Sequence, residues 1–243
     1  MENEYLFYAL VWLVAFLYAG VGHGGASGYL ALMALFAFPV DVMKPTALLL
    51  NLLVSLTAFI QYRKGGFFNT RLFLPFAIAS VPMAFLGGWI EVDAVLYRKM
   101  LGILLLLPAL RFLLFDDGRF RKGRPVDRYA SLIIGGIIGF LSGLIGIGGG
   151  ILLSPILLMM GWTDQKQTAA LSAPFILVNS IAGLAGQMAN GVRIGPETIA
   201  PVAVAFTGGL VGAWLGANRF DSSTIRRMLG WVLLVAAWKL LFA

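Results

Sequence analysis

In GVGHGGASGYLALMALF (residues 20–36), five glycines and the only histidine of the chain interrupt a hydrophobic run. A second stretch, GLIGIGGGILLSPILLMMGW (residues 143–162), repeats the pattern. The glycines coincide at a shift of 124 residues, which places Gly22, Gly24 and Gly25 on Gly146, Gly148 and Gly149. The two clusters therefore predict two related halves, each containing a helix broken by glycine.

The composition decides the class of protein. Of the 243 residues, 60% are hydrophobic and only 12% are charged. Soluble domains carry about a quarter charged residues, and apolar stretches of about 20 residues are typical of membrane-spanning helices. The composition predicts an all-α, polytopic integral membrane protein. Apolar segments are expected at 5–21, 26–38, 46–62, 72–90, 96–115, 129–146, 149–160, 168–189, 197–217 and 224–242.

The scarcity of two residue types excludes several kinds of site. The chain has no cysteine and one histidine, which excludes disulfides and thiolate metal sites and argues against a transition-metal cluster. We expect no cofactor and no enzymatic activity. The basic residues lie in short loops between apolar segments, so they indicate membrane orientation and not nucleic-acid binding.

The two halves also resemble each other at their ends. DAVLYRKMLGILLL (93–106) matches DSSTIRRMLGWVLL (221–234) at a shift of 128 residues. Between the halves lies the most strongly charged run, DDGRFRKGRPVDR (116–128). We therefore divide the chain into a first transmembrane repeat (1–115), a basic cytoplasmic linker (116–128) and a second transmembrane repeat (129–243).

The distribution of bases predicts how the repeats are oriented. The linker and the loop 63–71 should be cytoplasmic, because loops rich in lysine and arginine stay inside. If each glycine-broken segment enters and leaves on the same side, the loop 218–227 is cytoplasmic as well, and most of the 18 bases lie inside. This favours two inverted repeats with eight to ten membrane segments in the cytoplasmic (inner) membrane.

The glycine-broken segments are candidates for a substrate site. Segments 26–38 and 149–160 would span about 18–20 Å, which is less than the roughly 30 Å bilayer core. Short, glycine-interrupted segments at matching places in inverted halves indicate a transporter site near the membrane midplane. Helix starts after glycine runs present unpaired amides and the positive end of the helix dipole to anions. The predicted substrate-binding residues are Gly22, His23, Gly24, Gly25, Asn51, Ser55, Gly146, Gly148, Gly149, Gly150, Ser172 and Asn179.

The acidic residues support an anionic substrate. All eleven carboxylates fall at the termini, in predicted loops or near the ends of predicted spans. Carriers of cations or protons usually need an acid within the membrane, because an unpaired cation there is costly. Asn51 and Asn179 would instead offer amide donors without net charge. The expected partners are a small anion and the lipid bilayer.

His23 adds a second hypothesis. It lies within the glycine cluster of the first repeat only, and it is the one predicted intramembrane side chain that titrates near neutral pH. A protonated His23 would favour a bound anion, and the neutral form would favour its release. The proton is therefore a candidate coupling ion.

Three alternatives remain open at this stage. GASG (25–28) has the form found in rhomboid intramembrane proteases, which would make Ser27 a nucleophile and His23 its base. In rhomboids, however, the histidine comes from a later helix, and the second repeat has Ile151 in place of Ser27. The glycines could also serve only helix packing, and the protein could be an anion channel.

The same motifs support a family resemblance. The paired GVGHGG (20–25) and GLIGIGGGILLSPILLMMG (143–161), together with RKMLG (98–102) and RRMLG (226–230), resemble the sulfite exporter TauE/SafE family over nearly the whole chain. The resemblance implies a membrane transporter for sulfite or organosulfonates. The chain departs from its own repeat pattern at His23, where the second copy has Ile147, and at PTALLLN (45–51), opposite ALSAPF (170–175).

Overall fold

The computed structural model describes residues 2–20, 23–114, 123, 125–218 and 222–242. Within these ranges the chain forms ten α-helices and one short 3-10 helix, and no strand. The expected all-α fold is confirmed. Gly22 and most of the linker 116–128 lie outside the described residues.

The helices of the two halves correspond in order and length. The first half contains α1 (Glu2–Gly20), α2 (Ala26–Leu35), α3 (Val40–Lys64), α4 (Thr70–Trp89) and α5 (Ala94–Leu114). The second contains α6 (Arg128–Ile145), α7 (Gly150–Met159), α8 (Gln165–Ala189), η2 (Pro196–Thr198), α9 (Ile199–Asn218) and α10 (Ser222–Phe242). The lengths pair as 19 and 18, 10 and 10, 25 and 25, 20 and 20, and 21 and 21 residues.

Four of the longer helices begin at polar caps near the surface. Asn69, Asp93, Asp127 and Asp164 accept hydrogen bonds from backbone amides at the starts of α4, α5, α6 and α8. Such caps satisfy amides that have no partner within the helix. They fix the helix starts in the loops, whereas α2 and α7 begin in the interior directly after a glycine, Gly25 and Gly149.

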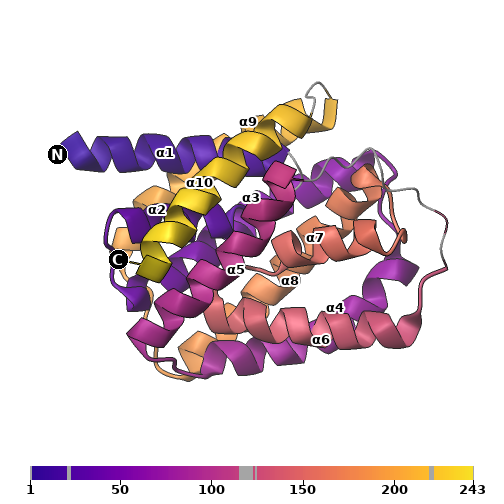
Figure 1. The fold of residues 1–243 in the computed structure, drawn as a ribbon, viewed down its shortest axis with the longest axis horizontal. Coiled ribbons are helices and arrows are strands. Elements are labelled where there is room, and N and C mark those ends of the chain that lie inside the picture. The colour runs from indigo at the N-terminus through magenta and orange to yellow at the C-terminus, as the bar shows by residue number, and fades with distance from the viewer. Residues whose placement is uncertain (1, 21–22, 115–122, 124, 219–221, 243) are drawn as a thin grey trace.

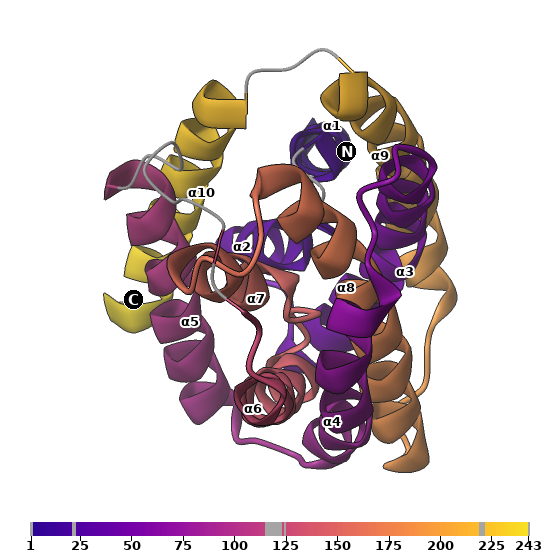
Figure 2. The ribbon, with the colours of Figure 1, turned by 90° about the vertical axis from the view of Figure 1, so that its right-hand side faces the viewer.

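The contacts between helices are repeated when each helix is replaced by its counterpart in the other half. Helix α4 packs on α6 as α9 packs on α1, and α4 packs on α8 as α9 packs on α3. In Figure 1, α1 and α9 lie along one edge of the molecule and α4 and α6 along the opposite edge. Figure 2 shows α5 and α10 on one side, α3 and α8 on the other, and the short helices α2 and α7 between them. The arrangement has an approximate twofold symmetry.

Two of the corresponding pairs, α5 with α10 and α3 with α8, run antiparallel. Figures 1 and 2 show α10 descending beside α5 in the opposite direction. Helix α3 runs against α8, because Tyr62 clusters with Ala169 at one end while Asn51 bonds to Ser180 near the middle.

Glycines allow the outer helices to approach closely. Gly135, Gly139 and Gly143 of α6 face backbone carbonyls of α4, and Gly135 has only 2.6 Å between its ideal Cβ position and the carbonyl oxygen of Phe76. In the other half, Gly208 and Gly212 of α9 face backbone carbonyls of α1. Small residues at such spacing are typical of membrane helix interfaces, where they let backbones approach.

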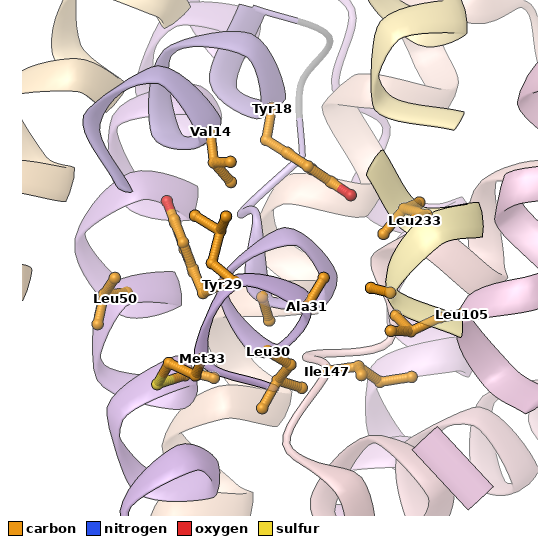
Figure 3. Close-up of a cluster of buried hydrophobic side chains, with 14 of the residues drawn as sticks. Val14, Tyr18, Tyr29, Leu30, Ala31, Met33, Leu50, Leu105, Ile147 and Leu233 are labelled. Carbon is orange, nitrogen blue, oxygen red and sulfur yellow. The ribbon is translucent and has the colours of Figure 1, made fainter. Parts of the chain in front are cut away.

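Helix α2 lies in the largest hydrophobic core. Tyr29, Leu30 and Met33 are almost fully buried in a cluster that also contains Leu105 of α5 and Leu233 of α10 (Figure 3). A short helix surrounded on all sides by apolar side chains has no polar face. Its position is therefore set by packing and by the hydrogen bonds at its two ends, one of which is the bond from the Lys239 ammonium to the carbonyl of Leu35 at 2.9 Å.

Among the residues that the structure describes, four helices are long and apolar enough to cross a membrane: α3, α4, α6 and α8. Five further apolar helical stretches are shorter, at Glu4–Gly20, Ala26–Leu35, Gly150–Met159, Ile199–Leu215 and Leu233–Phe242. The predicted multi-pass character agrees with these helices, and the number of eight to ten membrane segments stays a prediction.

Candidate functional site

The two short helices begin in the same way. Helix α2 follows Gly25 (φ 95°) and α7 follows Gly149 (φ 79°), both in the left-handed region, and a glycine has no side chain with which to cap the helix that follows it. Residues other than glycine rarely adopt this conformation. The glycines thus turn the chain sharply inside the protein and leave the first amides of each helix directed toward the interior.

The two glycine turns meet at the same two side chains. Ideal Cβ atoms on Gly24 and Gly148 would stand 2.8 Å and 2.9 Å from Cγ2 of Ile176, and both would crowd the carboxamide of Asn51. These contacts leave no room for larger residues. The structure thus brings Gly24 and Gly148 together at Asn51 and Ile176, and a substrate site at this place stays a prediction.

This meeting point lies halfway along the longest helices. Asn51 is the twelfth residue of the 25-residue α3, and Ile176 is the twelfth residue of the 25-residue α8. The two residues also correspond in the repeat, because the shift of 125 that places Ser55 on Ser180 places Asn51 on Ile176. Helices of 25 residues are about 37 Å long, enough to cross a bilayer, so their middle corresponds to the membrane interior.

Asn51 joins three elements at this point. Its Oδ1 accepts a hydrogen bond from the backbone amide of Ala26 at 2.9 Å, and its Nδ2 donates to Oγ of Ser180 at 3.4 Å. Asn51 is completely buried. One end of its carboxamide therefore caps α2, and the other end ties α3 to α8.

His23 belongs to a second buried polar group. Its Nε2 lies 2.8 Å from Oγ of Ser154, which lies 2.8 Å from Oγ of Ser172 and donates to the carbonyl of Gly150 at 2.9 Å. Ser172 lies beside the start of α7, since its carbonyl oxygen is 3.3 Å from the ideal Cβ position of Gly150. The predicted residues His23, Ser172 and Gly150 are thus brought together across the two repeats.

Ser154 was not predicted as a site residue. It lies within ten residues that are otherwise apolar, glycine or proline, GILLSPILLM (150–159). A lone hydroxyl one turn after the first residue of a broken helix would have been the signal. Its partner His23 is 131 residues away in the sequence, so no local pattern connects them.

The other predicted residues make contacts of their own. Ser55 donates to the carbonyl of Leu52 in its own helix at 3.5 Å. Asn179 donates to the carbonyl of Phe175 at 2.8 Å, while its buried Oδ1 has no hydrogen-bond partner. Gly146 ends α6 and packs against the backbone of Lys44. Gly22 lies outside the described residues.

The arrangement does not pair Ser27 with His23. The hydroxyl of Ser27 donates to the hydroxyl of Tyr18 at 2.9 Å, whereas His23 bonds to Ser154. A serine nucleophile needs a base within hydrogen-bond reach. In the part of the chain that the structure describes, no three His, Cys, Asp or Glu side chains gather in a way that could hold a metal ion.

Known proteins resemble the chain over most of its length. The family model of the sulfite exporter TauE/SafE matches residues 7–240. A probable membrane transporter protein of Sinorhizobium fredii, y4hK, is 38% identical over the whole of both chains. Another, MJ0441 of Methanocaldococcus jannaschii, is 30% identical over 57% of this chain and 53% of its own. YunE of Bacillus subtilis, with the same description, is 24% identical over 81% and 79%. No solved structure matches.

Proposed function

Because the chain belongs to the sulfite exporter TauE/SafE family of membrane proteins, we propose that it is a secondary transporter that moves a small sulfur-containing oxyanion, sulfite or an organosulfonate, across the cytoplasmic membrane. The names of its relatives describe membrane transporters. The observation that carries the proposal is the meeting of two glycine-started helix tips halfway along paired 25-residue helices.

The proposed mechanism is alternating access between two inverted repeats. Helices related by a twofold axis along the membrane normal run parallel, and those related by an axis within the membrane plane run antiparallel. The antiparallel course of α5 against α10, and of α3 against α8, supports the second arrangement (Figure 1). Transporters with inverted repeats hold substrates at the repeat interface near the midplane.

The proposed substrate site lies between the two helix tips. It comprises the residues Gly22, His23, Gly24, Gly25, Asn51, Ser55, Gly146, Gly148, Gly149, Gly150, Ser172 and Asn179. Backbone amides at helix starts favour anions through direct hydrogen bonds and through the helix dipole. The fully buried hydroxyl of Ser172 and the buried imidazole of His23 add polar groups without a fixed negative charge. We further propose that a proton on His23 is coupled to the anion.

Two rival functions lead to different measurements. An anion channel would share the same polar interior but would not exchange one anion for another. An intramembrane serine hydrolase would need Ser27 to be activated. The hydrogen bond of Ser27 to Tyr18, and not to His23, speaks against this role for Ser27.

The deciding experiment uses the purified protein in proteoliposomes. Vesicles loaded with unlabelled sulfite should accumulate labelled sulfite from outside, with saturation and with faster uptake than empty vesicles. Methanesulfonate, sulfate and chloride on the inside establish which anions exchange. Protein-free vesicles and the Ser27→Ala variant serve as controls, and the variant should transport like the wild type. Flux that rises linearly with concentration and shows no exchange would indicate a channel, and loss of all function in Ser27→Ala would favour the hydrolase.

A further inference from the structure

The two helix tips, although related by the repeat, differ in how their first amides are satisfied. At the α2 tip, Oδ1 of Asn51 accepts the amide hydrogen of Ala26 at 2.9 Å. The bond occupies one of the unpaired amides and places a carbonyl oxygen, with its partial negative charge, at the helix start. Asn51 is fully buried and held from its other end by Ser180, so this oxygen is fixed in place.

The α7 tip lacks such a cap. The shift of 124 that aligns the glycine clusters places Ala26 on Gly150, and the residue that corresponds to Asn51 is Ile176. A hydrocarbon side chain accepts no hydrogen bond. Among the described residues, no group accepts a hydrogen bond from the backbone amides of Gly150 and Ile151, and both residues are buried. Buried amides are nearly always paired. Two unpaired amides at a helix start can therefore donate hydrogen bonds to an anionic acceptor.

Polar side chains lie at both tips, since Asn51 and the buried hydroxyl of Tyr29 are at the start of α2, but the bonded group of His23, Ser154 and Ser172 lies at the α7 tip. The repeat places His23, Ser154 and Ser172 on Ile147, Leu30 and Ala47, all three of which are apolar and buried. Figure 3 shows Leu30 and Ile147 among the side chains of the core cluster around α2. One side of the approximate symmetry thus holds a polar group, and the equivalent place on the other side is hydrophobic.

The hydrogen bonds of Ser154 hold donors ready for an acceptor. A hydroxyl has one hydrogen and two lone pairs, and Ser154 donates its hydrogen to the carbonyl of Gly150. His23 and Ser172, each 2.8 Å from its oxygen, then act as donors to Ser154. An oxyanion at the α7 tip could replace Ser154 as the acceptor for both.

An additional buried hydroxyl points to a ligand at the same tip. Ser142 is fully buried, and its Oγ has no hydrogen-bond partner. Its Cβ lies 3.4 Å from the ideal Cβ position of Gly149, the residue directly before the first turn of α7. A buried hydroxyl without a partner is unfavourable, and a ligand oxygen would supply the missing partner.

We propose that the transported oxyanion binds at the α7 tip alone, through the amides of Gly150 and Ile151 and the side chains of His23 and Ser172. At the α2 tip, Asn51 already occupies the first amide of the helix. This inference rests on the proposed function and narrows it, since Asn51 then serves α2 and not the anion.

Two variants test the assignment. Ser172→Ala removes a donor from the α7 tip, and Ile176→Asn gives α7 the cap that Asn51 gives α2. Each should weaken the affinity for sulfite about ten- to a hundred-fold, the loss typical of one hydrogen bond to a charged ligand. The matched controls are Ser27→Ala, a buried hydroxyl in the first turn of α2, and Ile176→Val, which shortens the side chain without adding an oxygen. Both controls should stay within about threefold of the wild type.

Affinity is measured by titration calorimetry on the detergent-purified full chain with sulfite and methanesulfonate. Gel filtration and a thermal melt establish that each variant is folded. Unchanged affinity in folded Ser172→Ala or folded Ile176→Asn overturns the inference while leaving the proposed function intact. Equal losses in Ser172→Ala and Ser27→Ala overturn it as well, because both tips would then bind the anion. A wild-type protein that neither binds nor transports either anion overturns the proposed function and the inference together.

Discussion

Replacing Gly148 by alanine tests whether the two glycine turns meet as described. A methyl group at this position would crowd Nδ2 of Asn51 and stand 2.9 Å from Ile176 and 3.2 Å from Oγ of Ser180. These atoms cannot retreat freely, because the carboxamide of Asn51 is bonded to Ala26 and Ser180. Gly148 also has a φ of 72°, which strains any residue with a Cβ.

The two costs can be estimated separately from other glycines of the chain. Left-handed backbone strain costs about 1–2 kcal/mol for alanine, and overpacking a filled interior costs about 1–3 kcal/mol. Gly191 has φ 89° and open space around it, so Gly191→Ala carries only the first cost. Gly24 is crowded by Asn51 and Ile176 but has no left-handed φ, so Gly24→Ala carries only the second. Gly148→Ala should therefore destabilise the protein by about 2–5 kcal/mol, near the sum of the other two.

The assay is reversible unfolding in mixed detergent micelles, followed by tryptophan fluorescence and circular dichroism. Gly66→Ala is a second control, since Gly66 has φ 75° and nothing within reach of a new methyl group. A loss for Gly148→Ala no larger than that for Gly191→Ala would refute the described packing. So would a Gly24→Ala variant as stable as the wild type.

Three further predictions follow from the site and the topology. Single cysteines in the loops 63–71, 116–128 and 218–227 should resist membrane-impermeant reagents in intact cells, whereas labelling of 218–227 alone would contradict the inverted arrangement. Asn51→Leu should lower the free energy of unfolding by about 0.5–2 kcal/mol because it removes the cap on α2, and an unchanged melt would show that the cap contributes nothing. The affinity for methanesulfonate, whose charge does not change in this range, should rise as pH falls from about 8 to about 5.5, since a protonated His23 adds a positive charge beside the anion, and His23→Gln should lose this slope. The same slope in both proteins would remove His23 from the coupling.

The helix breaks could be predicted from the sequence because they are encoded locally. The expected segments 26–38 and 149–160 became Ala26–Leu35 and Gly150–Met159, since the glycines before them adopt the left-handed conformation that ends a helix. The start of α3 was placed at residue 46, six residues too late. Asp41, Lys44 and Pro45 interrupt the apolar pattern, yet polar residues and proline are tolerated near a helix start.

The connections of the site could not be predicted, because they join residues far apart in the chain. Asn51 and Ser180 are 129 residues apart, and His23 and Ser154 are 131 residues apart. Composition identified Asn51 and His23 as polar groups among apolar ones. Only the crossing of α3 and α8 decides that the oxygen of Asn51 caps one short helix while Ile176 leaves the other uncapped.

Helices α3 and α8 are joined at two places along their length. Asn51 bonds to Ser180 at the middle, and Tyr62 clusters with Ala169 toward one end. Asn51 and Tyr62 are about 16 Å apart along α3. Two helices joined at two separated places resist rocking about either one, so we expect α3 and α8 to move together when the protein opens toward one face of the membrane.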